Sequence, residues 1–450
     1  MKPYHERPTP RRTKRYPPSS SILYQSPGKE IFILDIPRSL ELAQQFSTAV
    51  PEGSAHQLQN ENRKQYDQRS LLSCPPLQEP YPHPPEPKSA KARKRVLGRI
   101  PVAEREFDER VVKVIEGALG HVRARYVGVW CLAREWVEAA DEPEGVKGRG
   151  KRRRDKVDDE NEDEESLSNS NESSTSIPSA FNTPPIILSP GINSFPDTPS
   201  LRGSIVKNPS SLPATIHLSS KSSSRIYIPP KCTFLLTHLT PSPPSTYSNA
   251  NLPKFTLLLF DPPWPNRSVR RSAHYATTPT FPAIQSLITD LVSSHVQLTE
   301  DTPTTAPGIV GIWTTNSAHS RATTRNVFSA TGLEVFEEWI WVKCTDNGVP
   351  VLPLGALWRR AYEVLMWGRR VEKKDNERTK VKRRVIFAVP DVHSRKPALK
   401  ELVERVFFSE RQTERGYTAM EIFARNLTAG WWAVGDEVWK FNCEEWWKNK

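Results

Sequence analysis

The residues best suited to chemistry follow the apolar run Leu257–Phe260 and read Asp261, Pro262, Pro263 and Trp264. The run predicts a buried strand, and open sheets of strands and helices place reactive groups at the carboxyl ends of their strands. The Asp261 carboxylate and the Pro262 carbonyl supply two hydrogen-bond acceptors, and consecutive prolines fix the backbone without adding a competing N–H group. Two such acceptors can hold both N–H groups of an exocyclic amine while its nitrogen attacks an electrophile. Trp264 offers a flat face for a base taken out of its stack.

The exocyclic N6 amine of adenine fits this pair of acceptors. Its lone pair is delocalised into the ring, and hydrogen bonds from both N–H groups favour the pyramidal nitrogen that can accept a methyl group. The alternative is a strand that simply stops at a Pro-Pro turn, with Trp264 in the core. An apolar strand that runs directly into Asp-Pro-Pro-Trp is much rarer than an Asp-Pro-Pro triplet alone, so we favour the chemical interpretation.

The elements that must position this motif lie beyond Arg225, where 11 of the 13 tryptophans occur, from Trp264 onward. Apolar runs of strand length alternate here with runs of helical spacing. We expect strands at 232–236, 255–260, 309–313, 335–342, 362–367, 385–389 and 421–423, and a helix at 283–292. A second helix, with Pro397 at its first position, would turn inward Leu399, Leu402, Val403 and Val406. This alternation predicts an α/β fold with an open sheet.

The rest of the chain divides by composition into three segments. Residues 1–30 are rich in Pro, Arg and Ser and predict a disordered tail. Residues 31–140 predict a small N-terminal module that is partly helical, with one strand at 31–37 and apolar helical spacing between 111 and 122. Residues 141–224 combine a basic run, an acidic run and Ser/Pro-rich sequence, and predict a disordered linker. Residues 225–450 would then form the catalytic domain.

The overall charge favours a polyanionic partner, since 63 Lys and Arg against 51 Asp and Glu give a net charge of +12. The basic run at 147–156 predicts nuclear import, and its alternative is a charged linker that only adds solubility. The five scattered cysteines show no CxxC spacing, so we expect no disulfide framework and no metal site. The polar N-terminus and the lack of a long apolar run predict a soluble intracellular protein without a membrane segment.

Four segments give the chain from about Arg225 to Asn442 a resemblance to the DPPW-type N6-adenine methyltransferases, and most of all to the branch called methyltransferase-like protein four. These segments are 261–271, 339–343, 394–397 and 421–431. The resemblance implies a Rossmann-like domain that transfers a methyl group from S-adenosylmethionine to the N6 amine of adenine in a nucleic acid, with RNA favoured over DNA. It also implies that the catalytic motif precedes the main cofactor-binding segment.

The resemblance implies a set of residues around the cofactor, namely Lys396, Glu421, Arg425, Asn426, Asp436 and Glu437. A strand-end carboxylate such as Glu421 suits ribose hydroxyls, while Lys396 and Arg425 suit the methionine carboxylate. Two positions depart from the family. Asp436 stands where relatives carry an asparagine, and a carboxylate accepts hydrogen bonds but cannot donate them. His238 stands where relatives carry an acid, and we interpret it as a polar loop residue rather than a cofactor neighbour.

The loop after the motif predicts substrate contacts through Arg267, Arg270, Arg271 and Tyr275, and we assign Lys343 to the same group. Clustered arginines would position phosphates and the tyrosine could stack on a base. The alternative is a solvated basic loop.

Two other functions compete with methylation of adenine. A catalytically inactive nucleic-acid-binding scaffold or partner subunit of the same fold would lose the acid or the aromatic residue of the motif, and neither is lost. Methylation of a protein glutamine is disfavoured by the positive charge and the arginine loop. Both a monomer and an association with a partner subunit fit the sequence.

Overall fold

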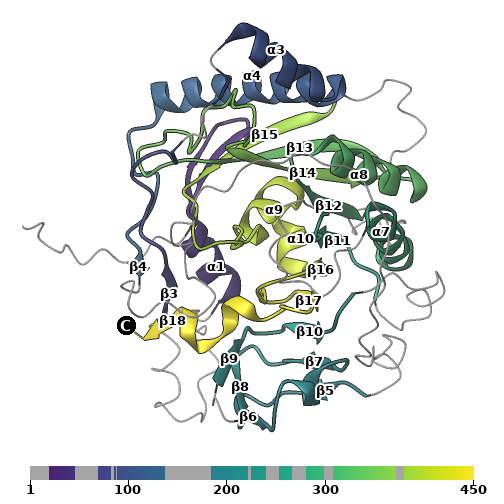
Figure 1. The fold of residues 1–450 in the computed structure, drawn as a ribbon. Helices are drawn as coiled ribbons and strands as arrows, with labels where there is room; N and C mark the ends of the chain where they lie inside the picture. Colours follow the sequence, from purple (N-terminus) through teal and green to yellow (C-terminus); the bar gives the residue numbers. More distant parts are fainter. Residues whose placement is uncertain are drawn as a thin grey trace, which may run out of the picture.

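The computed structural model describes residues 20–45, 69–82, 86–87, 89–136, 184–220, 224–239, 253–265, 280–297, 308–370 and 380–449. Its main feature is a 12-stranded sheet with the order β1-β2-β15-β13-β14-β12-β11-β16-β17-β10-β7-β5 (Figure 1). In that order the strands are Ile22–Gln25, Ile31–Leu34, Lys382–Ala388, Glu334–Lys343, Tyr362–Arg369, Ile309–Thr314, Leu257–Phe260, Ala419–Ile422, Trp432–Gly435, Thr233–Leu236, Ile205–Lys207 and Ile186–Ile187.

The directions of the strands bring several chain ends to one edge of this sheet. Strands β12, β11, β16, β17 and β10 are parallel neighbours, so their carboxyl ends coincide. Strand β14 is antiparallel to both β12 and β13, which places its first residues at the same edge as the last residues of β13. Strand β15 is parallel to β13 and also ends there. This shared edge carries the candidate site.

Helices cover both faces of the sheet. Alternate residues of a strand point to opposite faces, so a strand of apolar residues contributes to one core on each side. Leu258 and Phe260 of β11 belong to a core with helices α4 (Val102–Arg125), α7 (Phe281–His295) and α8 (Ala318–Ala330). Leu257 and Leu259 belong to a second core with helices α1 (Ile36–Gln44) and α9 (Lys400–Phe407). The short helices α3 (Ala90–Arg99) and α10 (Glu410–Arg415) complete the α-helical elements of the described residues. The result is the expected α/β, Rossmann-like arrangement.

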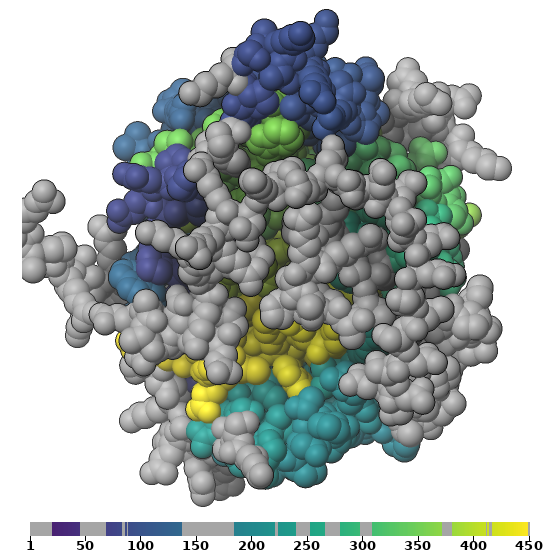
Figure 2. All heavy atoms as spheres, viewed as in Figure 1, coloured from purple at the N-terminus to yellow at the C-terminus, as the bar shows by residue number. Residues whose placement is uncertain are grey.

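Two small sheets flank the main one. Strands β18 (Trp447–Asn449), β3 (Arg69–Ser73) and β4 (Glu135–Trp136) form the first, and β6 (Gly191–Phe195), β8 (Ala214–Leu218) and β9 (Ser224–Ile228) form the second. Short 3₁₀ helices span Pro199–Leu201, Lys440–Asn442 and Glu444–Trp446. In Figure 2 the C-terminal segment, in yellow, lies beside the teal segment that contains the second small sheet. Within the part of the chain that the structure describes, none of the helices has the length and apolar character needed to span a bilayer.

The expected disordered linker at 141–224 is wrong for residues 184–220, which form β5 to β8. Its apolar residues are few but alternate with polar ones, and Val206, Ile216 and Leu218 are buried in a third core, which they share with residues of the main sheet such as Phe234 and Ala433. Strand β7 also pairs with β10 of the main sheet. A compositional argument misses such strands, because serine and threonine on one face hide the apolar face from a count. Residues 137–183, with the basic and acidic runs, lie outside the described residues.

Three N-terminal and helical expectations change in detail. Strand β1 lies inside the segment expected to be a disordered tail, of which residues 1–19 are outside the described part. The segment 31–140 is partly helical as expected, but β2 pairs in parallel with β15, so this segment contributes to the main sheet. Helix α9 begins at Lys400 and not at Pro397, because Leu399 in front of it is the capping residue. Leu402 and Val403 are buried as predicted.

Candidate active site

The Asp-Pro-Pro-Trp motif lies at the carboxyl edge of the sheet, directly after β11. The Asp261 amide donates a hydrogen bond to the Ile422 carbonyl at 3.1 Å, which extends the parallel pairing of β11 and β16 by one residue. On β16, Glu421 stands opposite Leu259. Asp261 and Glu421 line one pocket together with Lys396, Arg425 and Asn426. The structure therefore brings together residues that the sequence assigned separately to catalysis and to the cofactor.

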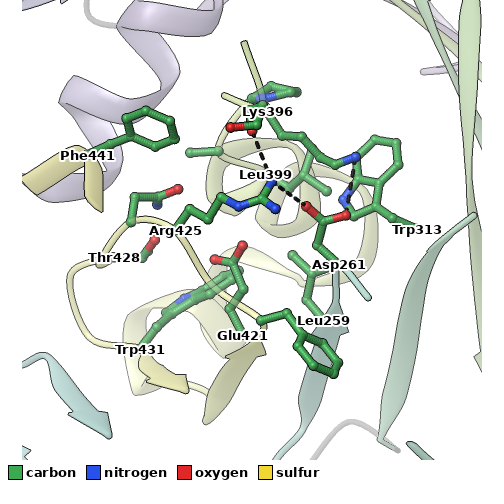
Figure 3. A pocket seen from close by; sticks show the side chains of 15 residues that line it. Leu259, Asp261, Trp313, Lys396, Leu399, Glu421, Arg425, Thr428, Trp431 and Phe441 are labelled. Carbon is green, nitrogen blue, oxygen red and sulfur yellow. Dashed lines mark hydrogen bonds and ion pairs between the residues drawn. The ribbon is translucent and has the colours of Figure 1, made fainter. Parts of the chain in front are cut away.

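Two cations hold the Asp261 carboxylate. Lys396 Nζ lies 3.2 Å from Oδ1, and one guanidinium nitrogen of Arg425 lies 3.8 Å from Oδ2. Figure 3 shows both side chains reaching toward Asp261 from different sides. Ion pairs with two cations on different segments fix the orientation of this carboxylate.

Glu363, which the sequence analysis missed, continues this chain of charges. It lies at the start of β14 and accepts from Lys396 at 2.7 Å and from Lys343 at 2.6 Å. Burial of Glu363 opposes its ionisation, but Lys396 and Lys343 outweigh burial and lower the pKa of Glu363 to about 2. Burial likewise opposes the charge of Lys396, and Asp261 with Glu363 raises the pKa of that lysine. A single acidic residue inside the apolar run 362–367 was the available sequence signal.

Lys343 therefore reaches the site through Glu363. Its ammonium group also lies 4.9 Å from the ring centre of Trp341, and that of Lys396 lies 4.7 Å from Trp313. The face of an aromatic ring attracts a cation, and this attraction offsets part of the hydration that the cation loses on burial. These contacts do not test the direct substrate contact expected for Lys343, which stays a prediction.

Glu421 differs from the other acids of the site because its carboxylate makes no hydrogen bond and no ion pair with any described residue. Burial and the nearby Asp261 raise the pKa of Glu421 to about 8, although Arg425 and Lys396 act in the opposite direction. Glu421 is half-buried and lines the pocket, so its carboxylate is open to a ligand. Two adjacent hydroxyl groups of a ligand would supply the missing donors, as a ribose does at strand ends of this kind.

The stacking role expected for Trp264 is wrong. Its side chain is only 6% exposed, lies in the core with α7, and donates from Nε1 to the Trp313 carbonyl at 2.7 Å. The Trp264 amide also donates to the Pro262 carbonyl at 2.8 Å. Trp264 thus fixes the turn that carries Asp261. Its ring packs against the protein core and has no open face on which a base could stack.

The backbone is strained on two sides of the pocket. Ser394 has φ of 68° and Phe423 has φ of 61°, and both line the pocket. Residues with a side chain rarely adopt this left-handed conformation, and where they do, the strain frequently accompanies a functional site. Both strained residues stand next to functional segments, one before Lys396 and the other before Arg425.

The two departures from the family pattern face each other. His238 follows β10 and Asp436 follows the parallel strand β17, and His238 Nδ1 lies 3.6 Å from an Asp436 oxygen. A hydrogen bond to Asp436 raises the pKa of His238. Burial opposes the charge of Asp436, but His238 outweighs it and lowers the pKa of Asp436. His238 is a half-exposed loop residue, and its pairing with Asp436 was not foreseen.

Glu437 binds Arg425 Nε at 3.1 Å and Lys440 at 2.7 Å, so it orients the arginine that reaches Asp261. Neither Asp436 nor Glu437 lines the pocket that contains Glu421. The loop residues Arg267, Arg270, Arg271 and Tyr275 lie outside the described residues. Across the described ranges, no group of three or more His, Cys, Asp and Glu is arranged to hold a metal ion.

Comparison with known proteins matches residues 255–437 to the MT-A70 family model. A protein of Cryphonectria parasitica, named N6-methyladenosine RNA methyltransferase MTA1, is 37% identical over 222 residues, which are 48% of this chain and 61% of the relative. A Pyricularia oryzae protein of the same name is 29% identical over 430 residues, covering 94% of this chain and 95% of the relative. The human N(6)-adenine-specific methyltransferase METTL4 is 31% identical over 247 residues, 53% of this chain and 47% of the relative.

The matched range begins just before β11 and ends just after Asp436, so it contains the Asp-Pro-Pro-Trp motif and the segment expected to bind the cofactor. The chain spans about three fifths of the first relative and half of the human one, and nearly all of the second. The resemblance expected from four short segments is confirmed over residues 255–437, which match the MT-A70 family model.

Proposed function

We propose that this protein transfers the methyl group of S-adenosylmethionine to the N6 amine of an adenine in a nucleic acid, with RNA favoured over DNA. The observation that carries the proposal is the position of the Asp261 carboxylate, which lies between Lys396 and Arg425 at the carboxyl end of β11. A carboxylate fixed before substrate binds needs no reorganisation during the reaction. Two of the relatives are named as RNA methyltransferases, which supports RNA as the substrate.

S-adenosylmethionine fits the residues that line the pocket, and when bound it supplies a methyl group on a positively charged sulfur. The unpartnered Glu421 carboxylate suits the ribose hydroxyls. Lys396 and Arg425 suit the methionine carboxylate, which they would bind in addition to Asp261. Asn426 lines the same pocket and offers both a donor and an acceptor.

The chain's own residues provide the acceptors for the adenine amine. Asp261 accepts one N–H group, and it is then placed to take the proton that the methylated nitrogen loses. The Pro262 carbonyl already accepts from the Trp264 amide, which fixes its direction, and its second lone pair remains for the other N–H group. Glu363 and Glu437 hold Lys396 and Arg425 in place around Asp261.

The substitution Asp261→Asn tests this proposal, because it keeps the size of the side chain and removes the charge. We expect the rate of methyl transfer to fall at least about 10²-fold, as for other preorganised groups of an active site. Asp197→Asn, in the distant segment before the 3₁₀ helix Pro199–Leu201, is the matched control and should keep full activity. Activity of Asp261→Asn within a few-fold of the wild type would overturn the assignment.

Nuclear localisation belongs to the same proposal. The basic run at 147–156, outside the described residues, would carry the import signal. A fluorescent fusion that lacks these residues should move from the nucleus to the cytoplasm. If this fusion stays nuclear, the import assignment is wrong.

A further inference from the structure

Helix α3 is the most basic element of the described chain. Its sequence, AKARKRVLGR, has five basic residues and no acidic one over Ala90–Arg99. It has no buried residue, and all five basic side chains, namely Lys91, Arg93, Lys94, Arg95 and Arg99, are exposed. Figures 1 and 2 show α3 on the outside of the molecule, across α4. Its charges are therefore open to a partner.

The charges of α3 are mostly not balanced within the protein. Arg93 pairs with Glu86 at 2.8 Å, whereas the other four cations form no ion pair with any residue in the described ranges. The adjoining helix α4 carries Glu104, Glu106 and Glu109, but among the described residues none of these binds α3. A solvated helix face can carry such charges at little cost. Because α3 has no buried residue, however, packing against the core contributes little to its stability and does not account for a helix at this position.

The spacing of these cations suits a nucleic-acid backbone. Lys91, Arg95 and Arg99 are four residues apart and form one ridge, with Lys94 beside it. Eight residues of helix extend about 12 Å, which corresponds to three or four nucleotides at about 3.4 Å of rise each. Successive phosphates of one strand can therefore be neutralised along this ridge.

Hydrogen bonds attach α3 and α4 to the segment that leads into the active site. Glu86, which pairs with the helix, accepts from the Leu357 amide at 2.6 Å. Asp108 of α4 binds Arg360 and accepts from the Tyr362 hydroxyl at 2.6 Å. The next residue is Glu363, the partner of Lys396. Glu363 lies six positions after Leu357 in the chain, and an extended chain of that length spans at most about 20 Å.

The surface between the helix and the site is also suited to a nucleic acid. Trp358 is 52% exposed and the Arg359 side chain beside it is exposed. Both lie in the segment that joins the Glu86 contact to the start of β14. A strand with its adenine at Asp261 would run past these residues toward α3.

We propose that α3 is a second binding surface for the nucleic-acid substrate, in which Lys91, Arg95 and Arg99, with Lys94, bind phosphates several nucleotides away from the target adenine. The proposal rests on the proposed function for the identity of the substrate. Contacts of this kind position the substrate and are independent of its bases. They raise affinity for long substrates and leave the chemistry at Asp261 unchanged.

The test compares the full-length triple variant Lys91→Gln, Arg95→Gln and Arg99→Gln with the wild type. Glutamine keeps the helix propensity of the replaced residues. At low salt, KM for a 20-nucleotide adenine-containing RNA should rise about tenfold or more, with kcat unchanged. The dissociation constant for the same labelled RNA should rise in parallel, and its dependence on log salt should become less steep by about 2, since each single-strand contact contributes about 0.7.

A matched control removes three exposed charges from α4, by Lys113→Gln, Arg123→Gln and Arg125→Gln. It changes the net charge equally and should leave KM and the salt slope near the wild-type values. A three-nucleotide substrate, too short to reach α3, should show the same KM with the α3 variant and the wild type.

Three outcomes would overturn the proposal. These are an α3 variant with wild-type affinity and salt slope, an α4 control that loses as much affinity, and a KM increase that is equally large for the short substrate. Loss of nuclear accumulation with unchanged RNA binding would assign α3 to a protein partner instead. If the wild type methylates no nucleic acid, the proposed function fails, and the binding measurements still decide whether α3 contacts RNA.

Discussion

Asp391 is predicted to be important for the stability of the protein, because it pairs with two buried arginines next to the site. The Asp391 carboxylate lies 2.8 Å from Arg395 and 4.0 Å from Arg134, and all three side chains are at most 1% exposed. It also accepts from the Cys74 amide at 3.1 Å. Arg395 in turn donates to the Leu72 carbonyl, and its guanidinium group lies over the rings of Phe441 and Trp446. Asp391 is thus the anion that compensates two buried guanidinium groups.

Asp391→Asn keeps the shape of the side chain but leaves both arginines without their shared negative charge. Loss of one partner of a buried ion pair costs about 3–5 kcal/mol, because an uncompensated charge stays buried. For a protein of this size that free energy lowers the melting temperature by about 3–5 °C. Chemical denaturation and thermal melting of the purified variant measure both quantities.

The matched control is Glu444→Gln, which removes the same charge from the exposed pair with Arg225. Exposed pairs contribute about 0–1 kcal/mol, so this variant should melt near the wild type. Arg395 precedes Lys396 in the chain, and methyl transfer by Asp391→Asn should therefore fall even at temperatures where the variant is folded. A loss of stability below about 1 kcal/mol, similar to that of Glu444→Gln, would refute the buried-charge reasoning.

Three further predictions concern the pocket and the second small sheet. Alanine at Lys396 or Arg425 should weaken S-adenosylmethionine binding by roughly 10-fold or more, because each charge-assisted contact contributes about 1.5–3 kcal/mol. If calorimetry shows unchanged affinity for both variants, these residues do not belong to the cofactor site. Burial raises the pKa of Glu421 from 4.5 to about 8, so this group favours folding most below pH 4.5 and that contribution is lost as pH rises to 8. Glu421→Gln should therefore stabilise the unliganded protein progressively between these pH values, and equal stabilities at pH 4.5 and 8 would contradict this. Replacement of residues 184–220 by a Gly/Ser linker should unfold part of the protein, because it removes β7, which pairs with β10 of the main sheet. A cooperative unfolding transition at the wild-type melting temperature would show that these strands are dispensable.

The residues that the sequence assigned to the site lie together where a reactive side chain and the end of a strand coincide. Asp261 and Glu421 follow or close short apolar strands, and parallel pairing brings such ends together whatever the rest of the chain does. Lys396, Glu421 and Arg425 were assigned to the cofactor by resemblance, and the structure places them in the same pocket as Asp261. The pairing of Lys396 and Arg425 with Asp261 depends on the arrangement of three different strands, which no local pattern contains.

The missed features depend on contacts between distant segments. Glu363 looked like an interruption of an apolar strand, and its role is evident only because an antiparallel β14 places it beside Lys396. Trp264 was given a role in stacking from its residue type, whereas the neighbouring helix α7 covers it. Strands β5 to β8 were missed because composition averages over both faces of a strand.

The most direct test of the central claim is identification of the methylated product. The purified full-length protein would be incubated with methyl-labelled S-adenosylmethionine and separate pools of RNA and DNA, and each pool would then be digested to nucleosides and analysed by mass spectrometry. We expect label in N6-methyladenosine from the RNA pool, and its loss with Asp261→Asn. Label on another atom or nucleoside, or no label from either pool while S-adenosylmethionine binds, would contradict the assignment of Asp261 as the acceptor for an adenine amine.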